Sequence, residues 1–165
     1  DEMQLTTKQR AMVARGENIT GAGGKAIAAS WFRGGRRAAV SVLVSGDTAT
    51  TPKAWDDSIS PTLLIHEATF LDEQRNKAEE HMHSTAAGAV ASAQAVGATY
   101  LALTHYSNRI KDSTVSEGEA RATADGLSVV ALNDNDRLVV DDDGDLTHLV
   151  WKSEGWTPAN IPPNR

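Results

Sequence analysis

The sequence contains no cysteine among its 165 residues. This absence excludes disulfides and thiolate zinc sites, so any metal ion must be bound by His, Asp or Glu. No apolar run approaches the roughly 20 residues needed to cross a bilayer, and residues 1–4 do not resemble a signal peptide. We therefore expect a soluble, cytoplasmic protein with no membrane partner.

An excess of basic residues is also absent. The 16 Lys and Arg residues are outnumbered by 22 Asp and Glu residues, which gives a formal net charge of -6. Because a nucleic-acid backbone attracts a basic surface, a nucleic-acid partner would need local compensation. Basic residues do gather at 33–37 and 109–111, although such clusters are more often solvated surface than binding sites.

Three apolar runs predict the strands of a parallel sheet. They cover 39–44, 63–65 and 100–103, and their composition is typical of strands buried on both faces. An alanine-rich segment over 85–96, followed by Gly97, predicts a helix between the second and third runs. Strand, helix and strand in this order indicate a parallel crossover, so the expected fold class is α/β with helices packed outside a sheet.

The remaining elements are predicted from glycine stops and short apolar runs. They are a helix over 5–15, a glycine-rich hairpin between Ile19 and Ile27, a helix over 117–124, and strands over 129–132 and 138–140. We expect one partial domain over 1–155 and an extended, proline-containing tail over 156–165.

Polar residues follow each of the three strands. They are Asp47, His66, Glu67 and His105. Open α/β sheets bind ligands at the carboxyl ends of their strands, and Asp47 and His105 are chemically suitable zinc ligands. The simpler interpretation is that Asp47 caps a turn, His66 and Glu67 form a local pair, and His105 is a hydrogen-bonded histidine.

Four segments occur in a distinctive order: SGDT at 45–48, LLIHEATF at 63–70, HST at 83–85 and LTHYS at 103–107. As a set they resemble ribonuclease Z, the tRNA 3′-end endonuclease family of the metallo-β-lactamase superfamily. The resemblance runs from the hairpin region to Leu132. It implies that the chain forms the C-terminal half of a metallo-β-lactamase αββα sandwich.

The resemblance also implies roles for four residues. Asp47 would bridge two zinc ions, and His105 would be a terminal ligand. His83, supported by Glu67, would donate a proton near the scissile phosphate. A carboxylate beside an imidazole fixes its tautomer and raises its pKa, which suits this role. The simpler interpretation of His83 is a residue at the start of a helix.

Phosphate contacts are predicted around the same site. His83 precedes a helix whose first backbone N–H groups would be unpaired, and such a helix end favours a phosphate. Ser107 and Arg109 are further candidates, because arginine can bind a phosphate through two N–H groups. An arginine beside a loop is more often merely solvated. His81 and His148 match no motif position.

The family's remaining metal ligands are not found in the sequence. In the family they come from a His-x-His-x-Asp-His motif and a further histidine, whereas none of the five histidines here has that spacing. Because each zinc ion binds about four ligands, Asp47 and His105 cannot complete two sites. Ala49, Asn108 and Ile110 also stand where the family commonly has a basic residue, a proline and a tyrosine.

The predicted function is a phosphodiesterase that uses zinc, or another divalent metal, to remove 3′ trailers from precursor tRNA. We expect a homodimer whose metal site is completed by an N-terminal half outside this sequence. One alternative is a phosphodiesterase with a different substrate. The other is a non-catalytic, truncated or diverged relative that serves as a dimerisation or nucleic-acid-binding module.

Overall fold

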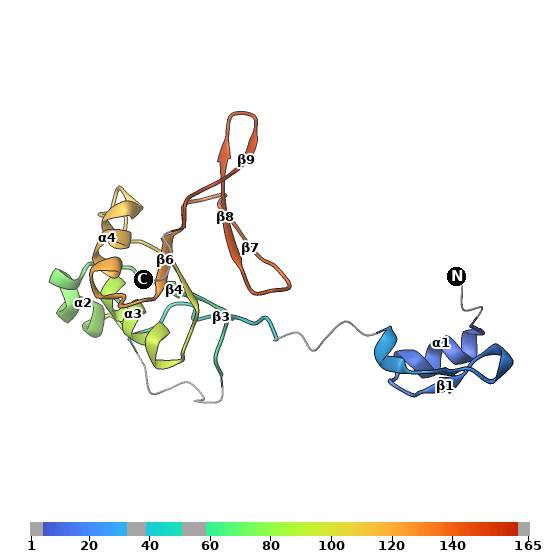
Figure 1. Ribbon diagram of the computed structural model, residues 1–165. Coiled ribbons are helices and arrows are strands. Elements are labelled where there is room, and N and C mark those ends of the chain that lie inside the picture. Colours follow the sequence, from blue (N-terminus) through green and yellow to red (C-terminus); the bar gives the residue numbers. More distant parts are fainter. Residues whose placement is uncertain (1–4, 33–38, 51–58, 162–165) are drawn as a thin grey trace. The chain divides into compact units, whose positions relative to one another are not determined.

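The computed structural model describes residues 5–32, 39–50 and 59–161. It divides the chain into two compact units, Asp1–Ala38 and Ala39–Arg165 (Figure 1). The expected partial domain over 1–155 did not include this division. Among the described residues, no helix is long and apolar enough to cross a membrane.

The first unit is a short helix packed on a small hairpin. Its elements are α1 (Thr7–Ala14), β1 (Ile19–Thr20), η1 (Ala22–Gly24), β2 (Ala26–Ile27) and η2 (Ala29–Trp31). Thr6 and Gln9 form a reciprocal capping box that satisfies backbone N–H groups at the start of α1. β1 and β2 pair antiparallel, with Ile19 opposite Ile27. The predictions of a helix and a glycine-rich hairpin are confirmed.

The second unit is built on a four-stranded parallel sheet. Its strands are β3 (Val42–Val44), β4 (Leu63–Glu67), β5 (Tyr100–Thr104) and β6 (Ser128–Ala131), in the order β3-β4-β5-β6. Between β4 and β5 lie η3 (Asp72–Gln74), α2 (Arg75–Glu80) and α3 (Ala86–Ala95), and α4 (Ser113–Thr123) joins β5 to β6. The predicted parallel crossover is confirmed.

The helix boundaries follow local capping chemistry. The Thr85 side chain caps α3 by accepting a hydrogen bond from the Gly88 N–H at 3.0 Å, and Gly97 follows the helix with φ 64°. α4 begins four residues before the predicted helix over 117–124, because Asp112 caps it by accepting from the Thr114 N–H at 2.9 Å. The hydrogen bonds from Thr114 also lower the pKa of Asp112.

Each face of the parallel sheet carries its own apolar cluster. On the helical face, side chains of α3 and α4 pack with Leu64, Leu101, Leu103 and Val129, all at most 1% exposed. On the other face, Leu63, Ala102 and Val130 pack against side chains that include Leu138, Val140 and Leu146. The unit therefore has a helix layer on one face of the sheet and further strands on the other.

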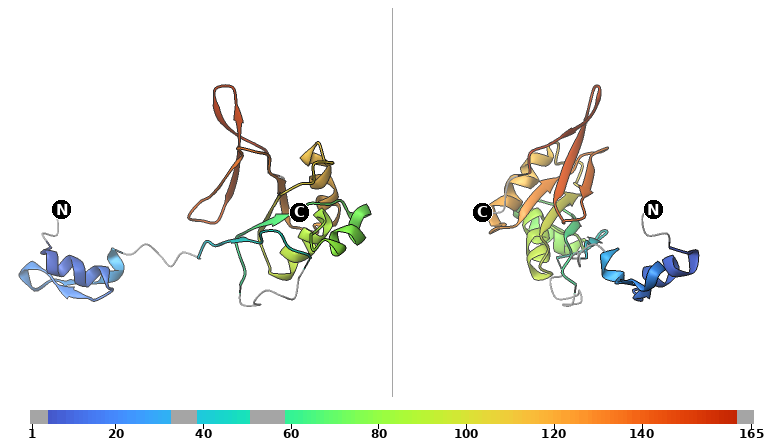
Figure 2. Two further views of the ribbon diagram at one scale, coloured as in Figure 1. Left: turned by 180° about the vertical axis from the view of Figure 1, so that it is seen from behind. Right: turned by 45° about the vertical axis from the view of Figure 1, so that its right-hand side comes forward.

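Those further strands form a second, antiparallel sheet of β7 (Arg137–Val140), β8 (Leu146–Lys152) and β9 (Gly155–Pro158). Figure 2 shows them in orange and red beside the parallel sheet. Trp151 and Trp156 are cross-strand partners, with ring centroids 5.1 Å apart in an edge-to-face arrangement. Only β7 was predicted. Residues 156–158 of the expected tail pair with β8, and 162–165 lie outside the described residues.

The first strand differs from its prediction. β3 starts at Val42 rather than Ala39, and the side chains of Val42 and Val44 are 52% and 64% exposed instead of buried. β3 is an edge strand whose only partner among the described residues is β4. Leu43, on the opposite face, does pack against the helical cluster. The apolar run predicted the strand correctly, but the predicted burial on both faces holds only for the face that carries Leu43.

Two helical glycines should respond to alanine in opposite ways. A methyl group at Gly88 in α3 would collide with the hydroxyl oxygens of Thr50 and Ser84, whereas at Gly118 in α4 it would meet nothing within 4 Å. We expect Gly88→Ala to lower the free energy of unfolding by about 1–3 kcal/mol and Gly118→Ala to raise it by about 0.5–1 kcal/mol. Denaturant unfolding measures the free energy of unfolding of each variant. Equal changes in Gly88→Ala and Gly118→Ala would contradict the packing described here.

Candidate functional site

The four motif segments converge at the carboxyl ends of β3, β4 and β5. Asp47 follows β3, Glu67 ends β4, and His105 follows β5, while His83 lies in the loop before α3. The strands are parallel and adjacent, so their ends share one edge of the sheet. The expectation that these four residues lie together therefore agrees with the geometry.

Glu67 is the most buried charged side chain of this group, with 1% of its surface exposed. Its Oε1 accepts from the Thr48 backbone N–H at 2.9 Å and pairs with the His83 Nδ1 at 2.7 Å. Its Oε2 accepts from the N–H and the hydroxyl of Thr69, at 3.1 and 2.6 Å. Burial alone would raise the pKa of Glu67, but these hydrogen bonds outweigh burial and lower it.

His83 stands between this carboxylate and the solvent. Its side chain is 24% exposed, and its ring lies 5.5 Å from that of His105 in a near-parallel stack. Since Nδ1 is committed to Glu67, the other ring nitrogen, Nε2, is the one left for a ligand or a proton. The predicted Glu67–His83 pair is formed.

Asp47 and His105 form the exposed side of the site. Asp47 Oδ2 and His105 Nε2 are 3.6 Å apart, which is too long for a hydrogen bond. Their side chains are 62% and 48% exposed. His105 has φ 55°, a left-handed backbone conformation that is uncommon for residues other than glycine.

Asp47, His83 and His105 could hold a metal ion together. Each offers one ligand atom, and these three atoms all lie within 4.8 Å of one another. Two imidazoles and a carboxylate are a donor set that suits zinc, so the residues fit a metal ion. Three ligands do not fill one tetrahedral site, much less two. The sequence predicted His83 as a proton donor and not as part of this group.

The loop after β5 carries the two candidate phosphate contacts. The Ser107 N–H donates to the Thr69 carbonyl at 3.1 Å, and the Arg109 N–H donates to the Ser107 hydroxyl at 3.4 Å. Ser107 and Lys111 line a pocket of about 450 Å³ between this loop and the loop after β6. Arg109 is exposed and does not line this pocket. Lys111 is the cation that sequence reasoning grouped with Arg109 but did not place in the site.

The prediction that unpaired N–H groups at the start of α3 bind a phosphate is wrong. The N–H groups of Ala86 and Ala87 donate to the Phe70 carbonyl at 3.1 Å and to Glu119 Oε1 at 3.4 Å. The third, on Gly88, donates to the cap Thr85. A carboxylate from α4 thus already occupies the helix end where an anion would bind. The sequence could not show this, because Glu119 is 32 residues away.

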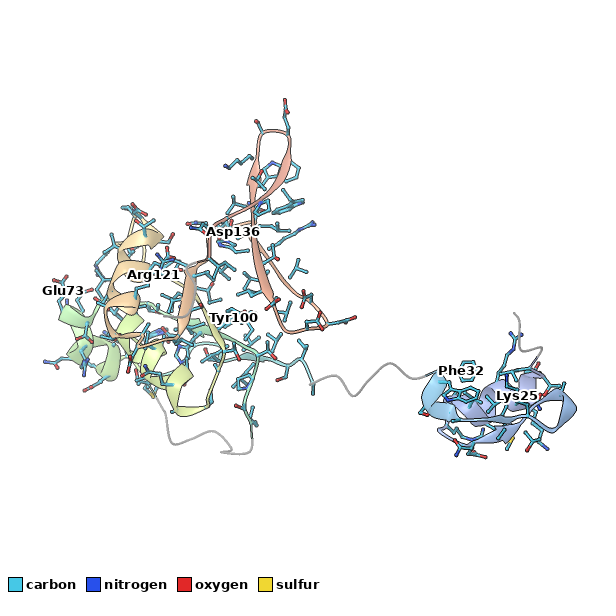
Figure 3. The ribbon with its side chains drawn as sticks, viewed as in Figure 1. Lys25, Phe32, Glu73, Tyr100, Arg121 and Asp136 are labelled. Atoms are coloured by element: carbon cyan, nitrogen blue, oxygen red, sulfur yellow. The ribbon has the colours of Figure 1, made fainter. Side chains whose placement is uncertain are left out.

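The other three histidines lie outside this group, and two of them, His66 and His148, are held in structural contacts. His66 is buried, its Nδ1 lies 2.8 Å from the Glu67 carbonyl, and burial lowers its pKa. His148 Nε2 lies 2.8 Å from Oδ2 of Asp136, which is labelled in Figure 3, and both side chains are under 10% exposed. His81 is exposed outside the ligand group.

Comparison with known proteins finds proteins similar to this chain. No family model matches the chain. The chain is 46% identical over 74 residues to ribonuclease Z of Pyrobaculum aerophilum, which covers 44% of this chain and 26% of that protein. It is 32% identical over 119 residues to ribonuclease Z of Halalkalibacterium halodurans, which covers 72% of this chain and 38% of that protein. Over these aligned lengths, the chain is similar to ribonuclease Z proteins.

The chain spans only about a quarter to two fifths of the length of these ribonuclease Z relatives. The structure also aligns with a solved metallo-β-lactamase fold protein of Bacillus subtilis, at 21% identity and a TM-score of 0.49. The alignment covers 65% of this chain and 38% of the Bacillus chain. The predicted α/β fold class is confirmed by the parallel sheet and the helices that connect its strands.

In this ribonuclease Z relative, Glu67 should make stability depend on pH. Its lowered pKa means that folding favours the ionised carboxylate, so its contribution is full above the ordinary value of 4.5 and is lost as pH falls through the folded pKa. Glu67→Gln should therefore be less stable than the parent at neutral pH, by a margin that shrinks below pH 4.5. Denaturant unfolding across pH measures this, with the exposed Glu80→Gln as control. A margin independent of pH would contradict it.

Proposed function

We propose that this chain supplies the proton donor and two metal ligands of a phosphodiesterase that removes 3′ trailers from precursor tRNA. The Glu67–His83 pair, joined at 2.7 Å beside Asp47 and His105, is the observation that carries the proposal. An imidazole paired with a carboxylate beside candidate metal ligands suits general acid catalysis of phosphodiester hydrolysis. The similarity of the chain to ribonuclease Z proteins supports tRNA as the substrate.

Asp47 and His105 would hold the metal, which we propose to be zinc. Their exposed ligand atoms are 3.6 Å apart with no hydrogen bond between them, so a cation between them would neutralise the carboxylate and accept the imidazole lone pair. Bound zinc supplies a Lewis acid and an activated water at neutral pH. The remaining ligands would come from an N-terminal half of the protein, because the chain matches only part of its relatives.

His83 would give its proton to the departing 3′ oxygen. Hydrogen bonds lower the pKa of Glu67, which favours its ionised form, and its Oε1 lies 2.7 Å from His83 Nδ1, where it fixes the orientation of the ring. The proton would leave from Nε2, the ring nitrogen that does not face Glu67. Transfer to the leaving oxygen avoids the release of a free alkoxide.

The phosphate would lie beside the loop after β5. Ser107 and Lys111 line the pocket there, so we place the phosphate contacts on this pocket and on the neighbouring Arg109, rather than on α3. Lys111 in the lining and Arg109 beside it supply positive charge to this pocket, which Asp134 also lines. We further propose a cytoplasmic homodimer, in line with the family resemblance.

A non-catalytic role is the second candidate. It is favoured by the three-member ligand group, which is too small for two zinc ions among the described residues. Metal content distinguishes the two candidates directly.

The natural gene product should contain about two zinc ions per chain. His105→Ala should lose at least one of them, because His105 offers an exposed ring nitrogen to the site. Elemental analysis of the purified protein measures the content. His81→Ala is the matched control, since His81 is exposed and outside the ligand group. A native protein without metal would reject the enzymatic proposal in favour of the non-catalytic one.

His83→Ala should lower the cleavage rate of a 3′-extended tRNA by about 10²–10⁴-fold, the usual contribution of general acid catalysis. Metal content should stay unchanged, because we assign the ring to Glu67 and the leaving oxygen. Rate and zinc content are measured on the same preparation, with His81→Ala as control. Loss of zinc from His83→Ala would show instead that His83 is a ligand, and unchanged cleavage would remove it from the mechanism.

A further inference from the structure

The Thr69 hydroxyl lies between the acid–base pair and the candidate metal ligand. Its oxygen, Oγ1, is 2.6 Å from Glu67 Oε2, 2.8 Å from His105 Nδ1 and 3.3 Å from His83 Nδ1. The residue is only 9% exposed, so these contacts are largely shielded from water. None of the roles proposed above uses Thr69.

The hydrogens of this cluster can be assigned from the number of donors. A hydroxyl has one hydrogen, and an ionised carboxylate can only accept. At 2.6 Å, the hydrogen of Thr69 therefore goes to Glu67, whose lowered pKa keeps it ionised. The Thr69 oxygen then has only lone pairs to offer to His105, so the 2.8 Å contact requires a hydrogen on His105 Nδ1.

His83 does not compete for the same position. Its Nδ1 is 2.7 Å from Glu67 Oε1 but 3.3 Å from the Thr69 oxygen, so its N–H donates to the carboxylate. Glu67 thus uses one oxygen for His83 and the other for Thr69. Its backbone bonds from Thr48 and Thr69 hold the carboxylate itself in place.

We infer that Thr69 is a positioning residue that relays the orientation of Glu67 to His105 and fixes the tautomer of that histidine. A hydrogen on Nδ1 leaves the lone pair on Nε2, the atom that lies 3.6 Å from Asp47 Oδ2. Two lone-pair donors then face each other, an arrangement that suits a shared cation. One buried carboxylate therefore orients both histidines, His83 directly and His105 through a hydroxyl.

The inference rests on the proposed function only for the identity of the cation. A purely structural role for Thr69 is the competing explanation, because its oxygen also lies 3.1 Å from the His105 carbonyl, where it could brace the left-handed backbone. The two roles differ in what they do to the imidazole ring. Only the relay determines which ring nitrogen carries the hydrogen.

The first test is the tautomer of His105 in the natural gene product stripped of metal by a chelator. Nitrogen-15 NMR of the histidine rings should show the hydrogen on Nδ1 in the parent protein. Thr69→Val, which keeps the shape but removes the hydroxyl, should lose this preference, and Thr69→Ser should retain it. A parent His105 with its hydrogen on Nε2 would overturn the inference, whether or not any variant folds.

The second test is zinc affinity, measured by competition with a chelator. Thr69→Val should weaken zinc binding by about 10–100-fold, the usual effect of removing a partner that orients a ligand, and Thr69→Ser should restore it. Thr147→Val on β8 is the matched control, because this exposed threonine lies outside the ligand group. Unchanged affinity and tautomer in a folded Thr69→Val protein would overturn the relay, as would equal loss in Thr69→Ser. Absence of tRNA cleavage would count against the proposed function but would leave both readouts intact.

Discussion

The site depends on satisfying one buried carboxylate. Glu67 is 1% exposed, and an ionised carboxylate in such a position is tolerated only when hydrogen bonds replace its lost water. The structure meets this need with donors from three places: the segment after β3, the segment after β4, and the loop before α3. The same bonds that keep Glu67 charged therefore hold three separate parts of the chain in one arrangement.

Exposure differs strongly between this carboxylate and most other residues of the site. Glu67 and Thr69 are buried, His83 is about a quarter exposed, and His105 and Asp47 are about half exposed or more. Orienting groups need burial, because competing water would weaken their hydrogen bonds. Groups that bind a metal or a substrate must instead remain accessible. These differences in burial thus match a division between residues that position and residues that bind.

Features that depend on neighbours in sequence could be predicted, and features that depend on distant contacts could not. Strands β4 and β5 and helix α3 follow from apolar runs and end signals, and the predicted strand ends placed Asp47 and His105 at one sheet edge. The pairing of the α3 N–H groups with Glu119 joins two helices, so local rules missed it. The β8–β9 hairpin was missed because its polar residues masked the alternation. Thr69 was overlooked because its role depends on the partners that the fold brings to it.

The exposed strand and the incomplete ligand set point to the same side of the molecule. β3 is an edge strand among the described residues, its Val42 and Val44 side chains face solvent, and Asp47 follows directly at its end. A segment that covered those valines would lie beside the strand that Asp47 follows. Apolar surface favours such a cover, and a metal bound at Asp47 and His105 would require further ligands. We therefore expect one segment to supply both the cover and the missing ligands.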